Sequence, residues 1–324
     1  MKRNGFTLTE LLVTITIIAT LAGMILGAVH KAGEMGKEYA TKATIAKLND
    51  IIMERYESYM TRRVPISTQG MPPRVAAEYR LWVLRDLMRM EMPDSFSDAK
   101  GRTTYPDTSA ADRPDNIALE MDQATISSFS WPVGTTFLAP GQTWPDGNTY
   151  PDRWGFKIEN SSFYGVARKA TTPSLARLYW QAIHSTPPPS NDSSPAQCLY
   201  MVVSLGSPEA LEQFNSSEIG TIENKPVFLD GWGKSIMWLR WAPGFTSPIQ
   251  SCDPVADHDP FDTRKVDATA FRLVPLIYSA GSDGEYDIDL VAGYVYTGNP
   301  YAEMKLGQPM IGEKHHDNIT NHSM

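Results

Sequence analysis

The first thirty residues constrain the fold more than any other part of the chain. From Leu8 to Val29 there are 22 residues, and Glu10 is the only charged one among them. A helix rises about 1.5 Å per residue, so this segment would span about 33 Å, enough to cross a hydrocarbon core about 30 Å thick. Lys2 and Arg3 precede the apolar run. The segment is therefore expected to form a membrane-spanning helix.

Two ordinary interpretations leave part of this segment unexplained. A secretory signal peptide has an apolar core of about 7–15 residues and a small-residue cleavage site, whereas this run is longer and no Ala-x-Ala follows it. A plain membrane anchor fits the length but does not explain Glu10. An acidic residue inside a membrane segment is costly, by about 2.5–3.5 kcal/mol at the helix centre on insertion scales, so Glu10 calls for a functional explanation.

A third interpretation accounts for every residue of the segment. It resembles the N-terminus of type IV pilins and type II secretion pseudopilins. In those proteins a short basic leader ends in Gly, the next residue is usually Phe, and a Glu lies five positions into the mature chain. The matching residues here are Lys2, Arg3, Gly5, Phe6 and Glu10. The resemblance implies that a prepilin peptidase cuts after Gly5 on the cytoplasmic side and that the new α-amine of Phe6 is methylated.

The resemblance also implies a role for Glu10. A lone carboxylate buried in a helix bundle is unfavourable, and the N-terminal ammonium of a neighbouring subunit would neutralise it. Glu10 is therefore expected to be an assembly residue, not a catalytic acid. The implied partners are the prepilin peptidase, other pilin or pseudopilin subunits and an inner-membrane assembly platform.

The implied location is the bacterial inner membrane, crossed once, with the N-terminus in the cytoplasm and the body outside it. Basic residues lie on both sides of the helix, and long domains translocate largely regardless of charge. The orientation therefore rests on the resemblance, and whether the filament is periplasmic or on the surface stays open.

Composition excludes some functions of the body. The formal net charge is −8, which argues against nucleic-acid binding. The two cysteines, Cys198 and Cys252, are too few for a metal framework. Outside the cytoplasm they can form a disulfide, or they can remain two separate buried thiols.

The helix is expected to continue beyond the membrane. No proline occurs between Lys31 and Met60, and apolar residues recur there at spacings of three and four, which is typical of an amphipathic helix. This stripe is expected to pack on a sheet, although a coiled coil or a free amphipathic helix has the same pattern. Its members are Ile45, Leu48, Ile52, Tyr56 and Tyr59, and the charged residues Lys47, Asp50, Glu54, Arg55 and Glu57 fall on other faces.

Prolines and a glycine between 62 and 73 end the long helix, and a second helix is expected over 75–90. Its apolar stripe comprises Ala77, Leu81, Leu84 and Met88, and its arginines (Arg80, Arg85 and Arg89) are expected on a solvated face. A short helix is expected over 174–183. The stretches 93–116 and 185–196 are rich in small polar residues and proline and are expected to be loops.

Short segments rich in β-branched and aromatic residues follow position 195 and predict strands. They cover 198–205, 226–229, 235–241, 271–279 and 290–297, and Ser207 is expected to cap a small helix among them. A long N-terminal helix followed by a mostly antiparallel sheet defines an α+β fold, of the kind that the pilin resemblance implies.

Two local sequences extend the resemblance to the major pseudopilins. Asp230-Gly-Trp-Gly233 resembles their Asp-x-Trp-Gly corner, and Ser279-Ala-Gly-Ser-Asp-Gly284 resembles a loop that comes later in their chains. A second Asp-x-Trp-Gly occurs at 152–155. The resemblance covers 1–60 and about 225–290, and it does not extend to 75–195, for which the sequence suggests no family.

Carboxylates alternate along the acidic loop: Asp283, Glu285, Asp287 and Asp289. On a strand they would share one face and repel one another, and Ca²⁺, which takes 6–8 oxygen ligands, would relieve the repulsion. The loop is not an EF-hand, because Ile288 stands where that motif requires Gly. The major pseudopilins bind calcium here, so the resemblance implies that Asp283 with Asp287 or Asp289 supplies ligands. The alternative is a solvated acidic turn.

No catalytic constellation is evident. Gly-x-Ser-x-Gly is excluded around Ser282, because position 280 is Ala. His315, His316, Asp317 and His322 lie near the C-terminus and can bind a transition metal weakly, but a disordered polar tail is the favoured interpretation.

The predicted function is a structural, non-enzymatic subunit of a type II secretion pseudopilus or a related type IV filament. The alternative is a membrane-tethered extracytoplasmic binding protein or hydrolase. The expected divisions are a leader (1–5), a membrane helix (6–29), its amphipathic extension (30–61), an inserted loop-rich region (62–195), a β-rich region (196–310) and a polar tail (311–324).

Overall fold

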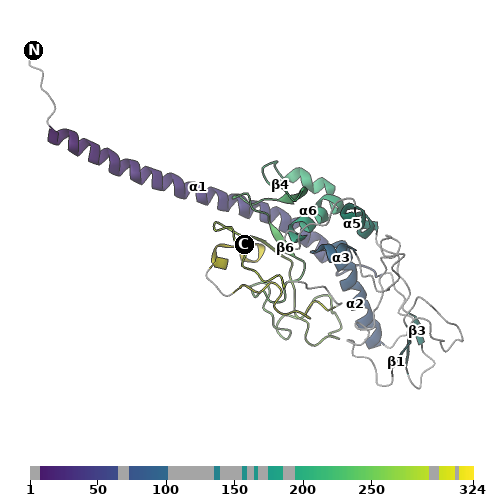
Figure 1. The fold of residues 1–324 in the computed structure, drawn as a ribbon. Helices are drawn as coiled ribbons and strands as arrows, with labels where there is room; N and C mark the ends of the chain where they lie inside the picture. Colours follow the sequence, from purple (N-terminus) through teal and green to yellow (C-terminus); the bar gives the residue numbers. More distant parts are fainter. Residues whose placement is uncertain are drawn as a thin grey trace, which may run out of the picture.

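One helix dominates the structure. In this computed structural model, α1 (Leu8–Ser58) runs without interruption for 51 residues. Its first half projects away from the body and its second half lies along it (Figure 1). The structure describes residues 8–64, 73–100, 135–138, 155–158, 164–166, 174–184, 194–291, 299–310 and 314–324. The predicted continuation of the apolar helix into an amphipathic one is confirmed.

Several shorter helices build the body: α2 (Pro73–Glu91), α3 (Phe96–Lys100), α5 (Ser174–His184), α6 (Ser194–Gly206) and the 3-10 helix η3 (Pro208–Gln213). Helices α2 and α5 confirm the predictions for 75–90 and 174–183. Ser207 is the N-cap of η3 and Pro208 its first residue, as predicted, although the Ser207 side chain makes no capping hydrogen bond.

The strands form three small antiparallel sheets. The first contains β1 (Thr135–Leu138), β2 (Gly155–Ile158) and β3 (Tyr164–Val166). The second pairs β4 (Ile219–Ile222) with β5 (Lys225–Phe228). The third has the order β6 (Met237–Leu239), β7 (Leu276–Ser279) and β8 (Ile319–Thr320), with Tyr278 paired to both Met237 and Thr320. A long N-terminal helix with antiparallel sheets confirms the α+β class.

The strand predictions hold only in part. Strands β5, β6 and β7 lie at or within the segments 226–229, 235–241 and 271–279, but the last two are shorter than predicted. Residues 290 and 291 are not in a strand, and 292–298 fall outside the described residues. Strand β2 begins at Gly155, the last residue of the first Asp-x-Trp-Gly.

The prediction of a strand over 198–205 is wrong, because this segment belongs to helix α6. Nearly every residue from Ser194 to Val203 is buried, since α6 contacts β5 and β6 as well as η3 and α5. An element covered on several sides shows a continuous apolar run, and such a run does not distinguish a buried helix from a buried strand.

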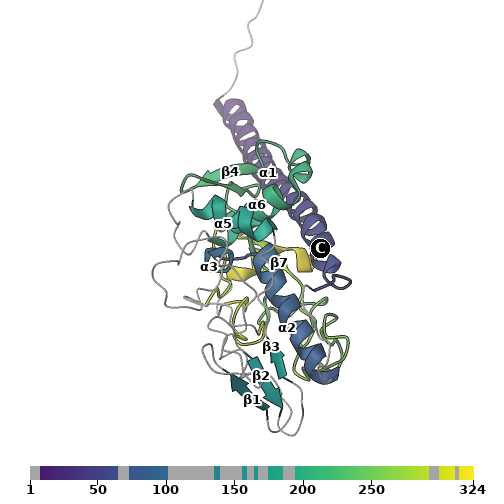
Figure 2. The same ribbon diagram turned by 90° about the vertical axis from the view of Figure 1, so that its right-hand side faces the viewer.

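The apolar stripe of α1 forms the centre of the core. Ile45, Leu48 and Ile52 are fully buried, and Tyr56 and Tyr59 are at most 4% exposed. They belong to one cluster with residues of α2, α5, α6 and the third sheet. Figure 2 shows α2 and the short helices on the same body as the second half of α1. Helices from the stretch predicted as an insertion therefore share this core.

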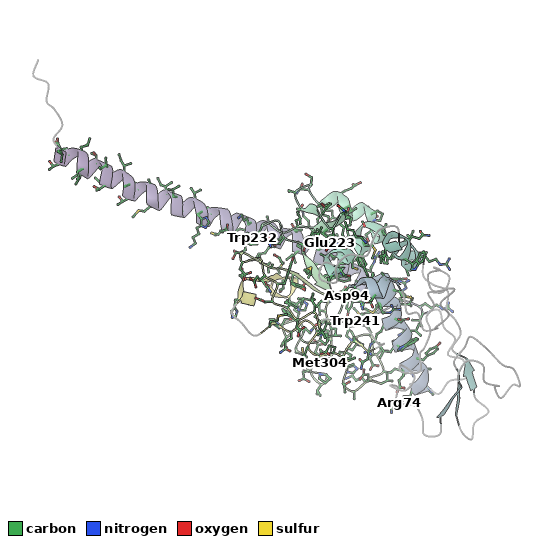
Figure 3. The ribbon with its side chains drawn as sticks, in the orientation of Figure 1. Arg74, Asp94, Glu223, Trp232, Trp241 and Met304 are labelled. Carbon is green, nitrogen blue, oxygen red and sulfur yellow. The ribbon has the colours of Figure 1, made fainter. Side chains whose placement is uncertain are left out.

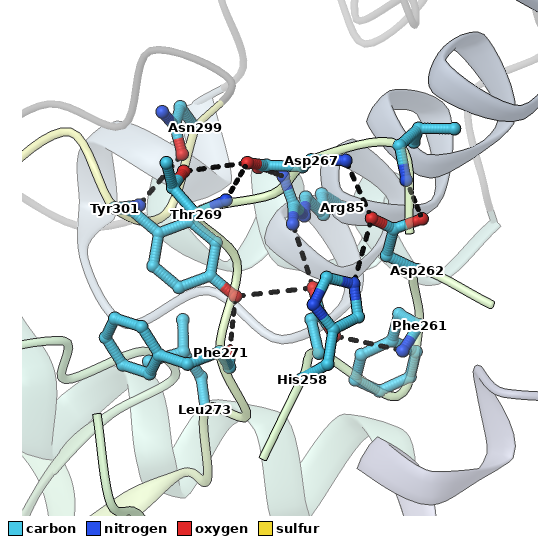
Figure 4. A network of polar contacts seen from close by, with 12 residues as sticks. Arg85, His258, Phe261, Asp262, Asp267, Thr269, Phe271, Leu273, Asn299 and Tyr301 are labelled. Atoms are coloured by element: carbon cyan, nitrogen blue, oxygen red, sulfur yellow. Dashed lines mark hydrogen bonds and ion pairs between the residues drawn. The ribbon is translucent and has the colours of Figure 1, made fainter. Parts of the chain in front are cut away.

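The arginines of α2 correct another prediction, since two of them are buried. Arg85 and Arg89 are 6% and 2% exposed. Arg85 Nη2 lies 2.8 Å from Asp259 Oδ2, and its other terminal nitrogen lies 3.6 Å from Asp267 (Figure 4). Arg89 Nε donates to Asp86 Oδ1 at 2.7 Å. A buried charge must be paired, and the two buried arginines of α2 are each neutralised by carboxylates of the body.

The C-terminal segment is not a disordered tail. It forms the 3-10 helices η4 (Lys314–Asp317) and η5 (Asn321–Ser323) around β8. The Asn321 amide accepts from Ile277 N at 2.8 Å and donates to Asn49 Oδ1 and Pro275 O at 2.9 Å each. The prediction was wrong because polar side chains of this segment form hydrogen bonds with the body and with α1, although its polar composition is typical of a solvated tail.

The cysteines do not form the disulfide that the sequence left open. Both are free: Cys198 is fully buried within α6, whereas Cys252 lies in a partly exposed loop. The Cys252 thiol lies 3.6 Å from Pro243 O and 3.7 Å from Phe245 O. The structure therefore has two separate thiols.

Candidate functional site: the apolar stem and the corner that holds it

We call Leu8–Val29 the stem. Its large apolar side chains are 52–81% exposed, and the most apolar 18-residue window of α1, of mean hydropathy 2.3, has none of its residues buried. The hydroxyls of Thr14, Thr16 and Thr20 donate to backbone carbonyls one turn earlier, so their polar groups are satisfied within the helix. The stem has the length, composition and internal hydrogen bonding that a lipid environment requires.

Glu10 lies in the first turn of α1 and is exposed. A carboxylate at this position interacts favourably with the positive end of the helix dipole. Gly5 and Phe6 lie outside the described residues. The first turn of α1, which holds the predicted assembly residue, is at the end of the helix that projects away from the body (Figure 1).

The body meets the helix at a tight turn, which we call the corner (residues 230–234). The Asp230 carboxylate organises it: Oδ1 accepts from Trp232 N at 2.9 Å and from Lys234 N at 2.8 Å. Its Oδ2 accepts from Ser279 Oγ at 2.6 Å. Asp230 therefore joins the two sequences that were singled out separately, the Asp-x-Trp-Gly corner and the Ser279–Gly284 loop.

Two hydrogen bonds attach the corner to α1. Gly231 N donates to Thr41 Oγ1 at 2.9 Å, and Trp232 Nε1 donates to Glu34 Oε2 at 2.7 Å. Hydrogen bonds from Lys37 and from Trp232 lower the pKa of the Glu34 carboxyl. Trp232 lies beside α1 where the helix leaves the body (Figure 3). The contact lies only five residues beyond the stem.

Gly231 permits the close approach. A Cβ at this position would lie 2.3 Å from the carbonyl oxygen of Lys37 and 2.7 Å from its Cα. Both are backbone atoms of α1 and cannot rotate away, so only glycine fits here. The sequence analysis identified the Asp, Trp and final Gly of the motif, but it missed Gly231, Glu34 and Thr41, because their roles arise from contacts distant in sequence.

The acidic loop is a turn and not a strand, so its carboxylates do not share a strand face as expected. Gly281 and Gly284 have φ of 68° and 75°, and Asp287 has φ of 45°. The Asp317 carboxylate accepts from Ser282 Oγ at 2.9 Å and from Asp283 N at 3.0 Å. This places an additional acid from the C-terminal segment against the loop.

The three predicted calcium ligands do not share a hydrogen-bond partner. Asp283 is exposed, and its Oδ1 accepts from Glu285 N at 2.8 Å. Asp289 Oδ1 accepts from Val291 N at 2.7 Å, and Asp287 Oδ2 is buried without a hydrogen bond. Within the described part of the chain, no three His, Cys, Asp or Glu side chains form a group suited to a metal ion. Calcium binding stays a prediction.

A basic residue distant in sequence does reach this loop. A Cβ built on Gly284 would lie 2.9 Å from Cε of Lys234, so the corner's lysine runs alongside the acidic loop. The lysine is a second candidate, besides a cation, for relieving the repulsion among these carboxylates.

His322 cannot serve the weak metal site considered for the C-terminus. Its Nδ1 lies 2.9 Å from Ser247 Oγ and its Nε2 lies 3.2 Å from Pro275 O. Burial lowers the pKa of its imidazole to about 4. Both ring nitrogens are engaged in packing the C-terminal segment on the body.

A comparison with known protein families supports the prepilin-type interpretation of the N-terminal segment. A family model described as the prokaryotic N-terminal methylation motif matches residues 1–26. The chain thus carries a prepilin-type N-terminal methylation motif, which implies processing by a prepilin peptidase and assembly with other pilin subunits. No curated protein and no solved structure matches the chain.

Proposed function

We propose that this chain is a structural subunit of a type II secretion pseudopilus or a related type IV filament, cleaved after Gly5 and assembled through the stem. The observation that carries this proposal is the division of α1. Its first half is apolar, exposed and marked by a single carboxylate, whereas its second half is the centre of the body's core. Such a helix anchors the body to a membrane and can join it to other subunits.

The decisive experiment is to determine the N-terminus of the protein in the membrane fraction. We expect a mature chain that begins at Phe6, with a methylated α-amine, because the junction Gly5–Phe6 lies inside the matched motif. Gly5→Leu should leave the leader in place, since a bulky side chain replaces the small residue at the cut. Asn4→Ala, one position earlier, is the matched control and should be cleaved.

A tethered binding protein or hydrolase would need no such processing. An unprocessed chain that begins at Met1, or a chain cut after Gly23, would contradict the filament proposal and favour the tethered alternative.

We further propose that the acidic loop binds Ca²⁺ through Asp283 with Asp287 or Asp289, with loop carbonyls completing the shell. The buried Asp287 Oδ2 that lacks a hydrogen bond supports this, because a buried carboxylate oxygen needs a partner. A ligand present at a hundred times its dissociation constant stabilises the folded state by about 2.7 kcal/mol. Metal-stripped protein should therefore melt several degrees higher in calcium than in chelator.

Asp283→Ala should abolish this calcium-dependent difference in melting temperature. Asp253→Ala, in an exposed loop of the body, is the matched control and should retain it. Equal melting temperatures of the unmodified protein in calcium and in chelator would mean that the loop is a solvated turn.

A further inference from the structure

A cluster of charged side chains that the proposed function does not use lies where helix α2 turns into helix α3. We call residues 92–96 the α2–α3 turn, and Asp94 marks it in Figure 3. Among the described residues the cluster comprises two arginines and three aspartates: Asp86, Arg89, Asp94, Asp98 and Arg240. Four of them are at most 3% exposed, and the side chain of Asp94 is 13% exposed. A buried charge needs a partner, so the pairing decides which groups are ionised.

Arg240, the residue that follows strand β6, holds the α2–α3 turn on the body. Its backbone N–H donates to Asp94 Oδ2 at 3.0 Å, and its Nη1 donates to the carbonyl oxygen of Met92 at 2.8 Å. The start of α3 is fixed on α6 as well, since Phe96 N donates to Ser194 Oγ at 2.9 Å. The α2–α3 turn is thus attached to two elements that are distant from it in sequence.

The two arginines do not supply separate partners for all three carboxylates. Arg89 Nε donates to Asp86 Oδ1 at 2.7 Å. The other two carboxylates face a single nitrogen, Nη2 of Arg240, which lies 2.8 Å from Asp98 Oδ2 and 3.6 Å from Asp94 Oδ1. The carboxyl groups of Asp94 and Asp98 also hydrogen bond to each other. An ionised carboxylate only accepts hydrogen bonds, so this contact requires a proton on one of the two groups.

Two further titratable groups face this site from neighbouring elements. Cys198 of α6 lies near both aspartates, and burial raises the pKa of its thiol well above the ordinary value, so the thiol is neutral. Lys225, the first residue of β5, places its Nζ 4.5 Å from the centroid of an aromatic ring of α3 and acts on the Cys198 thiol. The Asp94 carboxyl instead responds chiefly to burial, to Arg240 and to Asp98.

We propose that Asp94 and Asp98 share one proton and form a pH-sensitive latch for the α2–α3 turn. While the proton is bound, the turn is held against Arg240. When the proton leaves to solvent through the partly exposed Asp94 carboxyl, two neighbouring carboxylates repel each other in a buried site, and the turn loosens from the body. This inference is independent of the proposed function, because it concerns the body and involves neither the N-terminus nor the stem.

The electrostatics of Asp94 give the direction of the pH dependence. Burial raises the pKa of its carboxyl from the ordinary 3.8 to about 7, with Arg240 opposing the rise and Asp98 adding to it. Between these two values the folded chain holds a proton that the unfolded chain releases. The stability contributed by this group is therefore fully present below the ordinary pKa and is lost as the pH rises through about 7. The latch is closed in acid and loose in alkali.

The test compares the melting temperatures of the full chain in detergent and of its Asp94→Asn variant at about pH 5 and about pH 8.5. Asparagine keeps the shape, cannot ionise, and can donate an amide hydrogen to Asp98 in place of the shared proton. We expect the melting temperature of the variant, relative to the unmodified protein, to be several degrees higher at the alkaline pH than at the acidic one. Asp253→Asn, at an exposed aspartate, is the matched control and should show the same relative melting temperature at both.

Two local measurements complete the test. A carbon-13 NMR titration of the aspartate carboxyls should show one group that titrates near pH 7 and is missing in Asp94→Asn. At about pH 8.5, backbone hydrogen exchange over residues 92–98 should be at least tenfold faster in the unmodified protein than in the variant. A relative melting temperature of Asp94→Asn that does not change with pH, or aspartates that all titrate in the ordinary range, overturns the proposal. If the variant does not fold, the titration of the unmodified protein decides alone.

Discussion

Glu10→Ala is expected to leave membrane insertion and cleavage after Gly5 intact while reducing incorporation into filaments at least tenfold. Insertion is retained because the substitution removes a carboxylate whose transfer into lipid is unfavourable; an acid at the helix centre costs about 2.5–3.5 kcal/mol on insertion scales. Incorporation falls because the ammonium of a neighbouring Phe6 would then be buried without its partner, and an unpaired buried charge is strongly unfavourable.

Two further variants separate charge from position. Glu10→Gln keeps the size and the hydrogen-bonding capacity but removes the charge, so it should behave like Glu10→Ala if ion pairing is the cause. Glu57→Ala removes an exposed acid from the same helix outside the stem and should assemble normally. Sheared filament fractions, quantified against membrane fractions, give the measurement, and normal incorporation of Glu10→Ala would disprove the pairing role.

Features that depend on local pattern were predictable from the sequence. The apolar stripe from Ile45 to Tyr59 is buried as its spacing indicated, because helical periodicity shows directly which face is covered. Helices α2 and α5 were located for the same reason, and the stem was evident from its length and its lack of charge. The matched motif is likewise a short local sequence.

Features that depend on tertiary packing were not predictable. Residues 198–203 of α6 are nearly all buried, and a continuous apolar run of this kind shows no helical or strand periodicity. Arg85 and Arg89 look like a solvated face until Asp259 and Asp86 are placed beside them. The C-terminal segment looks like a tail until Asn321 is seen to bind the backbone of β7.

The corner combines a feature that the local sequence predicts with one that depends on tertiary packing. Its Asp, Trp and Gly were recognised as a motif, yet nothing local indicates that Trp232 reaches Glu34, which precedes it by 198 residues in the chain. The structure adds the reason for the motif: Asp230 shapes the turn, Gly231 permits contact with α1, and Trp232 extends the contact towards the stem.

Gly231→Ala should therefore weaken the attachment of the body to α1. The added Cβ would lie 2.3 Å from Lys37 O, and overpacking of a fixed contact typically costs about 1–3 kcal/mol. Because both clashing partners are backbone, we expect a loss near the upper end, about 3 kcal/mol, in the free energy of unfolding of the full chain in detergent. Backbone hydrogen exchange over residues 31–44 should rise as the corner separates from the helix.

Gly233→Ala is the matched control for that substitution. Gly233 has φ of 82° and no atom within 4 Å of an added Cβ, so the cost there is only that of a left-handed backbone, about 1–2 kcal/mol. Trp232→Phe removes the hydrogen bond to Glu34 and part of the aromatic packing while keeping a ring at this position, so it should raise hydrogen exchange near residue 34 with a smaller loss of stability than Gly231→Ala. If Gly231→Ala is no more destabilising than Gly233→Ala, and exchange over residues 31–44 is unchanged, the corner does not attach the body to α1.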